Sequence, residues 1–180
     1  GFFGMALTLS FRPINIVCSS LYQVLYQKVT DRVNENKSVL SLLGKFLLRI
    51  GSVTLLLFAV LYVLMPYIVS FLLGNEWIVV SDYIRIFLPW LFFVVLNTSL
   101  SFLPDVFCKQ SIYLLFEIVY ILLRLSALLI GVRANSMHTA LLLFSMIGAL
   151  VLLVELCWFI YMVVRYEKQR EQVGDTSKQC

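Results

Sequence analysis

The sequence predicts an all-α fold, a polytopic membrane bundle of five transmembrane helices. Hydrophobic residues make up 61% of its 180 positions and charged residues only 13%, and the mean hydropathy is +0.94. A soluble domain is about half apolar and a quarter charged, so this chain has more apolar side chain than one core of its size can bury. The surplus is expected to face lipid, where about 20 apolar residues suffice for a helix to cross the bilayer.

The first predicted span covers residues 1–26 and opens "GFFGMALTLSF". The chain starts inside an apolar run, without an initiator Met or the basic segment of a signal peptide, so we expect a piece of a longer membrane protein. Arg12, Pro13 and several hydroxyl residues make this span the weakest of the five. The polar segment 27–40 follows as a cytoplasmic linker that either extends the helix or connects it to the next.

The second span, 41–73, is the clearest, because no charged residue occurs between Arg49 and Glu76. Pro66 lies near its far end. A proline is tolerated in a membrane helix when neighbouring helices satisfy the carbonyl that it leaves without a partner.

The string "LGNEW" predicts an outer hairpin over 74–85. Gly74 is expected to make the bend, and Trp77 is expected to lie at the membrane interface, where tryptophan is enriched. The next span, 86–104, reads "IFLPWLFFVVLNTSLSFLP".

Two further spans complete the bundle. A cytoplasmic loop over 105–110 leads into a span over 111–131, and an outer loop over 132–138 leads into the last span, 139–164. The tail, 165–180, is polar and is predicted to be cytoplasmic.

Basic residues set the orientation, because lysines and arginines in short loops mark the cytoplasmic side. They gather in the linker, at the foot of the second span and in the tail: Lys28, Arg32, Lys37, Lys45, Arg49, Arg165, Lys168, Arg170 and Lys178. Both regions are therefore expected in the cytoplasm, and the even number of spans between them agrees.

Several classes of function find no support in the residues. The cysteines are scattered, without metal-ligand spacing or a disulfide framework: Cys18, Cys108, Cys157 and Cys180. His138 falls on an outer loop, where a solvated histidine is expected. The sequence has no nucleophile–base pair and no glycine-rich phosphate loop, so we expect neither an enzyme nor a bound cofactor or metal. No basic run with interleaved aromatics points to nucleic acid.

Four charged residues fall within the predicted spans: Arg12, Glu117, Arg124 and Glu155. A charge at bilayer depth is costly, so each is a candidate for function. The predicted topology puts both arginines near the midplane, where they suit an anionic substrate, and both glutamates in the cytoplasmic half, where they suit coupling to a proton or to Na⁺. The structural alternative is that Arg124 pairs with one of the glutamates and Arg12 with another polar group, only to hold helices together. A third alternative is that the helix ends fray and these charges lie at the membrane interface.

Four prolines are candidates for breaks in the helices: Pro13, Pro66, Pro89 and Pro104. Broken helices are frequent in transporters that work by alternating access, and prolines are also commoner in membrane helices generally.

Three strings in order resemble a known family: "LSFRPINIVCSSLYQVLYQKVTDRVNENKSVLSLLGKFLLRIG", "LLGNEWIVVSDYIRIFLPWLFF" and "TSLSFLPDVFCKQ". They are similar to segments of bacterial polysaccharide (Wzx-type) flippases, members of the multidrug/oligosaccharidyl-lipid/polysaccharide exporter superfamily. The resemblance covers about residues 3 to 165. It implies the last five helices of a MATE-like transporter with two lobes.

The resemblance also implies a function. Such flippases carry undecaprenyl-pyrophosphate-linked oligosaccharides across the bacterial cytoplasmic membrane for O-antigen, capsule or exopolysaccharide synthesis. Arg12 and Arg124 would then line a cationic cavity, with Glu117 and Glu155 as coupling or structural partners. Membrane lipid, the lipid-linked substrate, a polysaccharide polymerase and a chain-length regulator are the implied partners. A drug or lipid II exporter of the same superfamily, a polymerase or acyltransferase, and a helical scaffold remain alternatives.

Overall fold

The computed structural model describes the backbone of residues 2–35, 37–133 and 137–176. Side chains are described at 16, 18–35, 37–72, 74–131, 133, 138–170 and 172. This part of the chain is helical and contains no strand, which confirms the predicted all-α class. The elements are α1 (Phe2–Asn34), α2 (Leu40–Leu73), the short 3₁₀ helix η1 (Asn75–Trp77), α3 (Ile78–Leu100), α4 (Leu103–Val106), α5 (Gln110–Arg133) and α6 (Met137–Thr176).

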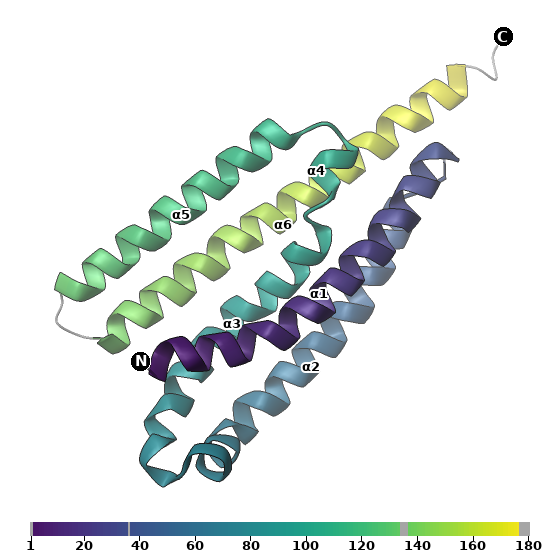
Figure 1. Ribbon diagram of the computed structural model, residues 1–180. Coiled ribbons are helices and arrows are strands. Elements are labelled where there is room, and N and C mark those ends of the chain that lie inside the picture. Colours follow the sequence, from purple (N-terminus) through teal and green to yellow (C-terminus); the bar gives the residue numbers. More distant parts are fainter. Residues whose placement is uncertain (1, 36, 134–136, 177–180) are drawn as a thin grey trace.

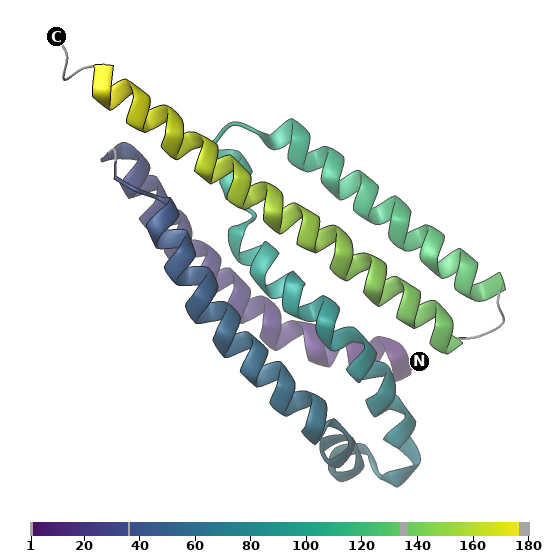
Figure 2. The same cartoon turned by 180° about the vertical axis from the view of Figure 1, so that it is seen from behind.

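Helix α3 is the centre of the arrangement (Figures 1 and 2). It packs against α1, α2 and α6, while α5 packs on α6 and forms the opposite edge from α2. In both views α5 and α6 lie side by side and run antiparallel. We call the end of the bundle at η1 the hairpin end and the end at the α1–α2 connection the linker end.

Within the described residues, four helices are long and apolar enough to cross a membrane. They cover Leu40–Leu72, Asn75–Val106, Gln110–Gly131 and His138–Arg170. The predicted span over 1–26 falls largely on residues whose side chains lie outside the described set, so a fifth crossing stays a prediction. Large apolar side chains stand exposed on these helices, with Phe71 88% and Leu48 75% accessible, as expected of surfaces that face lipid.

The helices extend further than the predicted spans. Helix α1 continues to Asn34, through the first half of the expected linker, and α3 begins at Ile78, so most of the expected hairpin is helical. The turn itself is short: Gly74 has φ of +92°, a conformation that glycine adopts without steric cost, and η1 follows. Helix α6 continues past residue 164 to Thr176.

Buried residues form two clusters. The cluster at the linker end joins α1, α2, α3, α4 and α6, and its fully buried members include Val29, Val39, Phe102, Phe159 and Val163. The cluster at the hairpin end joins α3 with α1, α2 and α6: Cys18, Phe58, Phe87, Leu88, Trp90, Leu91, Val95, Leu141, Ala149 and Leu152. The second cluster contains Trp90, whose ring contacts Arg124.

Hydrogen bonds also join α3 to α6. Asn97 donates its amide to the carbonyl of Leu152 at 3.0 Å, and Ser145 donates to the carbonyl of Ile86 at 2.6 Å. The carbonyl that Pro89 leaves without a helical donor is that of Arg85, one residue before Ile86. Interhelical bonds of this kind contribute roughly 0.6 kcal/mol each in a membrane.

The prolines do not end the two helices that contain them. Pro66 and Pro89 lie inside α2 and α3, whereas Pro104 stands in the first turn of α4. Pro66 cannot donate to the carbonyl of Tyr62, four residues earlier. Arg85 of α3 supplies the missing donor, since its Nε lies 2.8 Å from that oxygen. The side chain of Pro13 lies outside the described residues.

A carboxylate of α6 caps the start of α2 at the linker end. Oε1 of Glu167 accepts the backbone N–H of Val39 at 2.6 Å and that of Leu40 at 3.0 Å. Oε2 lies 2.9 Å from Nη2 of Arg170. Because N-terminal amides of a helix favour a negative charge, this contact holds the linker against α6.

Candidate functional site

Arg124 lies near the middle of α5 and is enclosed by aromatic rings from three helices. Its guanidinium carbon is 3.7 Å from the ring centroid of Phe144 on α6, 4.1 Å from that of Trp90 on α3 and 4.9 Å from that of Tyr120 on α5. Each ring face attracts a cation, by about 0.5–2 kcal/mol depending on how far the pair is desolvated. We call these four residues the Arg124 cluster.

Hydrogen bonds order the Arg124 cluster around one hydroxyl. Nε1 of Trp90 donates to Oη of Tyr120 at 2.9 Å, and Nη1 of Arg124 donates to the same oxygen at 2.6 Å. A phenolic oxygen has two lone pairs and one proton. Both lone pairs are thus used, and the O–H proton of Tyr120 has no acceptor among the described residues.

The Arg124 cluster depends on the spacing of two residues on α5 and on one glycine of α6. Tyr120 and Arg124 are four residues apart, so they share a face of α5. Opposite them on α6, a Cβ at Gly148 would come within 2.9 Å of Trp90 Cδ1 and within 3.6 Å of Arg124 Nε. Glycine therefore provides the space into which the indole and the guanidinium fit.

The guanidinium keeps unused donors. Its Nε is buried and has no hydrogen-bond partner in the described part of the chain. None of the described carboxylates lies within ion-pair distance of it, because the ion pairs found there are Lys37–Glu35, Arg85–Asp82 and Arg170–Glu167. The cluster therefore presents a cation without a counter-ion, and the pairing of Arg124 with Glu117 or Glu155, the structural alternative above, is not formed.

The two glutamates come together, away from Arg124. Glu155 on α6 is only 3% exposed, and Glu117 on α5 is half-buried. The ring contacts of Tyr113 with Phe159 and of Phe116 with Trp158 set an antiparallel register in which the two glutamates lie opposite each other. Glu117 lies two turns from Arg124 on the same face of α5. Arg12 belongs to α1, but its side chain lies outside the described residues, so it is not placed relative to this site.

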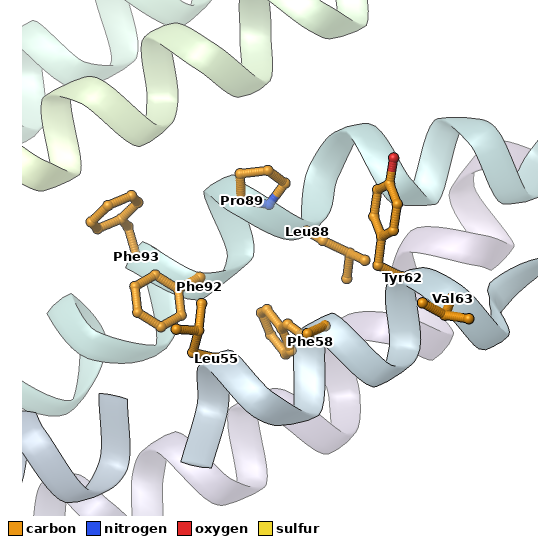
Figure 3. A pocket seen from close by; sticks show the side chains of 9 residues that line it. Leu55, Phe58, Tyr62, Val63, Leu88, Pro89, Phe92 and Phe93 are labelled. Atoms are coloured by element: carbon orange, nitrogen blue, oxygen red, sulfur yellow. The ribbon is translucent and has the colours of Figure 1, made fainter. Parts of the chain in front are cut away.

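A second feature is an open groove of about 650 Å³ between α2 and α3 (Figure 3). Phe58 and Tyr62 face Leu88, Pro89 and Phe92 across it. Its remaining lining residues are Leu55, Ala59, Val63 and Phe93. The groove lacks an ionisable group apart from the Tyr62 phenol, so it suits an apolar chain and offers nothing to an anion.

Sequence reasoning singled out Arg124 but missed the aromatic residues that enclose it. Trp90 and Phe144 lie in apolar runs, where aromatic side chains most often pack or face lipid. The one local signal was the spacing of four between Tyr120 and Arg124. No group of three or more histidine, cysteine, aspartate or glutamate side chains with metal-binding geometry occurs among the described residues.

Comparisons with known proteins return no relative. No protein-family profile, curated protein or solved structure matches this chain. The family resemblance therefore rests on the three sequence strings, and the function has to be argued from the site.

Proposed function

We propose that this chain is the C-terminal part of a bacterial flippase that moves lipid-linked oligosaccharides across the cytoplasmic membrane. The carrying observation is Arg124, a cation that has no counter-ion among the described residues and that aromatic rings hold in the middle of an apolar helix. The motif resemblance supports the same function. Coupling to H⁺ or Na⁺ and a cytoplasmic C-terminus belong to the proposal.

The chemistry of the Arg124 cluster suits a pyrophosphate linked to a sugar. Guanidinium N–H groups form short, charge-assisted bonds to phosphate oxygens, often two at once. The free Nε of Arg124 and the O–H of Tyr120 are the donors available for this. A cation that already had a carboxylate partner would lose that partner on binding an anion. Arg124 would instead gain its first counter-ion.

No covalent chemistry is required of the chain. The substrate head group binds at the cationic cluster while its polyprenyl tail stays in the bilayer, and the two lobes of the transporter alternate around the site. A hydrolase or transferase would instead need a nucleophile with a base beside it, and the Arg124 cluster contains neither.

The test uses the full-length protein in cells that lack their own copy, with surface polysaccharide as the readout. We expect Arg124→Ala to reduce display by about tenfold or more at equal protein level, because a charge-assisted phosphate contact contributes about 1.5–3 kcal/mol. Arg124→Lys should be milder, because it keeps the charge. Arg133→Ala is the matched control, an exposed arginine at the end of the same helix.

Normal display in the Arg124→Ala strain would refute the role of this site. Normal display in cells without the protein, together with a loss of drug resistance, would instead identify a drug exporter of the same superfamily.

A further inference from the structure

Glu155, which is buried, and Glu117, which is half-buried, face each other across the α5–α6 interface. Three contacts set the antiparallel register of these helices: Tyr113 with Phe159, Phe116 with Trp158, and Gly131 with Ala140. In this register Glu117 lies opposite Glu155. Both helices are among the four that can span a membrane, so the pair lies at bilayer depth.

No cation accompanies this carboxyl pair in the described part of the chain. Glu155 is 3% exposed and makes no hydrogen bond or ion pair there. Arg124 is two turns away, engaged by its aromatic rings, and the basic residues of α2, Lys45 and Arg49, are exposed.

The other polar groups around the pair are neutral. Tyr113 and Tyr120 on α5 present phenols to it. On α3, Asn97 spends its amide donors on the carbonyls of Phe93 and Leu152. Its Oδ1 remains a buried acceptor without a partner, at about the level of Glu155. Tyr113 donates its O–H to Glu117, whereas Glu155 and the Oδ1 of Asn97 receive no donor from the described residues.

Two ionised carboxylates in such a place would be strongly disfavoured. Burial in an apolar medium opposes each negative charge, and a second negative charge nearby opposes it further. Removing one charge relieves both effects. The most economical way is to bind one proton, which also supplies a further hydrogen-bond donor.

We infer that Glu117 and Glu155 form a proton-binding site that holds one proton at neutral pH and carries a single negative charge. A sodium ion would need several more oxygen ligands, and the backbone carbonyls of the continuous helices α5 and α6 are already used in the helices. If the proposed function holds, the proton is the coupling ion. An anion bound at Arg124, about 10 Å along α5, would then strengthen proton binding by roughly tenfold at an effective dielectric of 20.

The experiment is infrared spectroscopy of the purified full-length protein as a function of pH. At neutral pH the wild type is expected to show a protonated-carboxyl band that Glu155→Gln abolishes. Raising the pH should convert this band to that of a carboxylate. Glu117→Gln should move the midpoint down by roughly one pH unit or more, because the neighbouring charge is gone. Glu76→Gln, at an exposed carboxyl in η1, is the control and should leave the band unchanged.

Two results would overturn the inference. One is a spectrum in which wild type and Glu155→Gln have the same protonated-carboxyl intensity at neutral pH. The other is a midpoint that moves when Na⁺ replaces K⁺ at constant ionic strength, which would identify a sodium site. Neither readout depends on polysaccharide display, so this inference and the proposed function can fail separately.

Discussion

The contact between Arg85 and the carbonyl of Tyr62 makes a sharp prediction about Pro66. The proline removes the N–H that would normally bond to this oxygen, and Arg85 replaces it from the neighbouring helix at 2.8 Å. If this is why the contact exists, the contribution of Arg85 to stability must depend on the proline. Replacing Pro66 by alanine restores the backbone donor and makes the Arg85 hydrogen bond to this oxygen largely redundant.

The size of the effect follows from the groups involved. A hydrogen bond to a charged group contributes about 1.5–3 kcal/mol in proteins, and interhelical bonds in membranes have measured couplings of roughly 0.6 to 1.7 kcal/mol. We therefore expect Arg85→Ala to destabilise the protein by about 2 kcal/mol. In the Pro66→Ala background the same change should cost about 1 kcal/mol less.

The assay is a double-mutant cycle on the full-length protein, with unfolding free energies measured in detergent by denaturant titration. Arg85 also stacks on the Tyr62 ring at 4.9 Å and faces Asp82 at 3.6 Å, and both interactions are the same in either background. A repeat of the cycle with Tyr62→Leu keeps the carbonyl, removes the ring and should give the same coupling. Additivity within about 0.3 kcal/mol would refute the reasoning.

Two further predictions concern helix contacts. Glu167→Ala leaves the buried N–H of Val39 without an acceptor and should lower the unfolding free energy by about 2–3 kcal/mol; Glu167→Gln should recover about half of this loss in the same denaturant titration. Gly131→Val should separate α5 from α6, because a Cβ there would overlap the Cα and Cβ of Ala140. Cysteine cross-linking between these helices should then fall several-fold, while Gly44→Val, at a glycine with open space around it, should have no such effect.

The membrane-helix class could be predicted because composition alone decides how much of a chain has to leave water. The helix limits could not. The hairpin expected over 74–85 includes Asp82 and Arg85, yet both lie within α3. Arg85 bonds there to a carbonyl 23 residues earlier in the chain, and no local sequence pattern reports such a partner.

The charged residues of the candidate site could be predicted from the sequence, but their neighbours on other helices could not. Arg124 and Glu155 stand out because charges are rare in apolar runs. What lies beside them depends on the helix register, which placed a cluster of rings around Arg124 and a second carboxyl opposite Glu155. Sequence spacing relates residues on one helix, such as Tyr120 and Arg124, but not residues on different helices.

The capping of α2 by Glu167 also has a consequence for biosynthesis. The two partners are 128 residues apart, so α2 enters the membrane long before its cap has been translated. At about 5–20 residues per second, the carboxylate follows roughly 6–25 seconds later. During that interval water or another group has to satisfy the first amides of α2. The first turn of α2 is completed only when α6 has been synthesised and Glu167 can bind it.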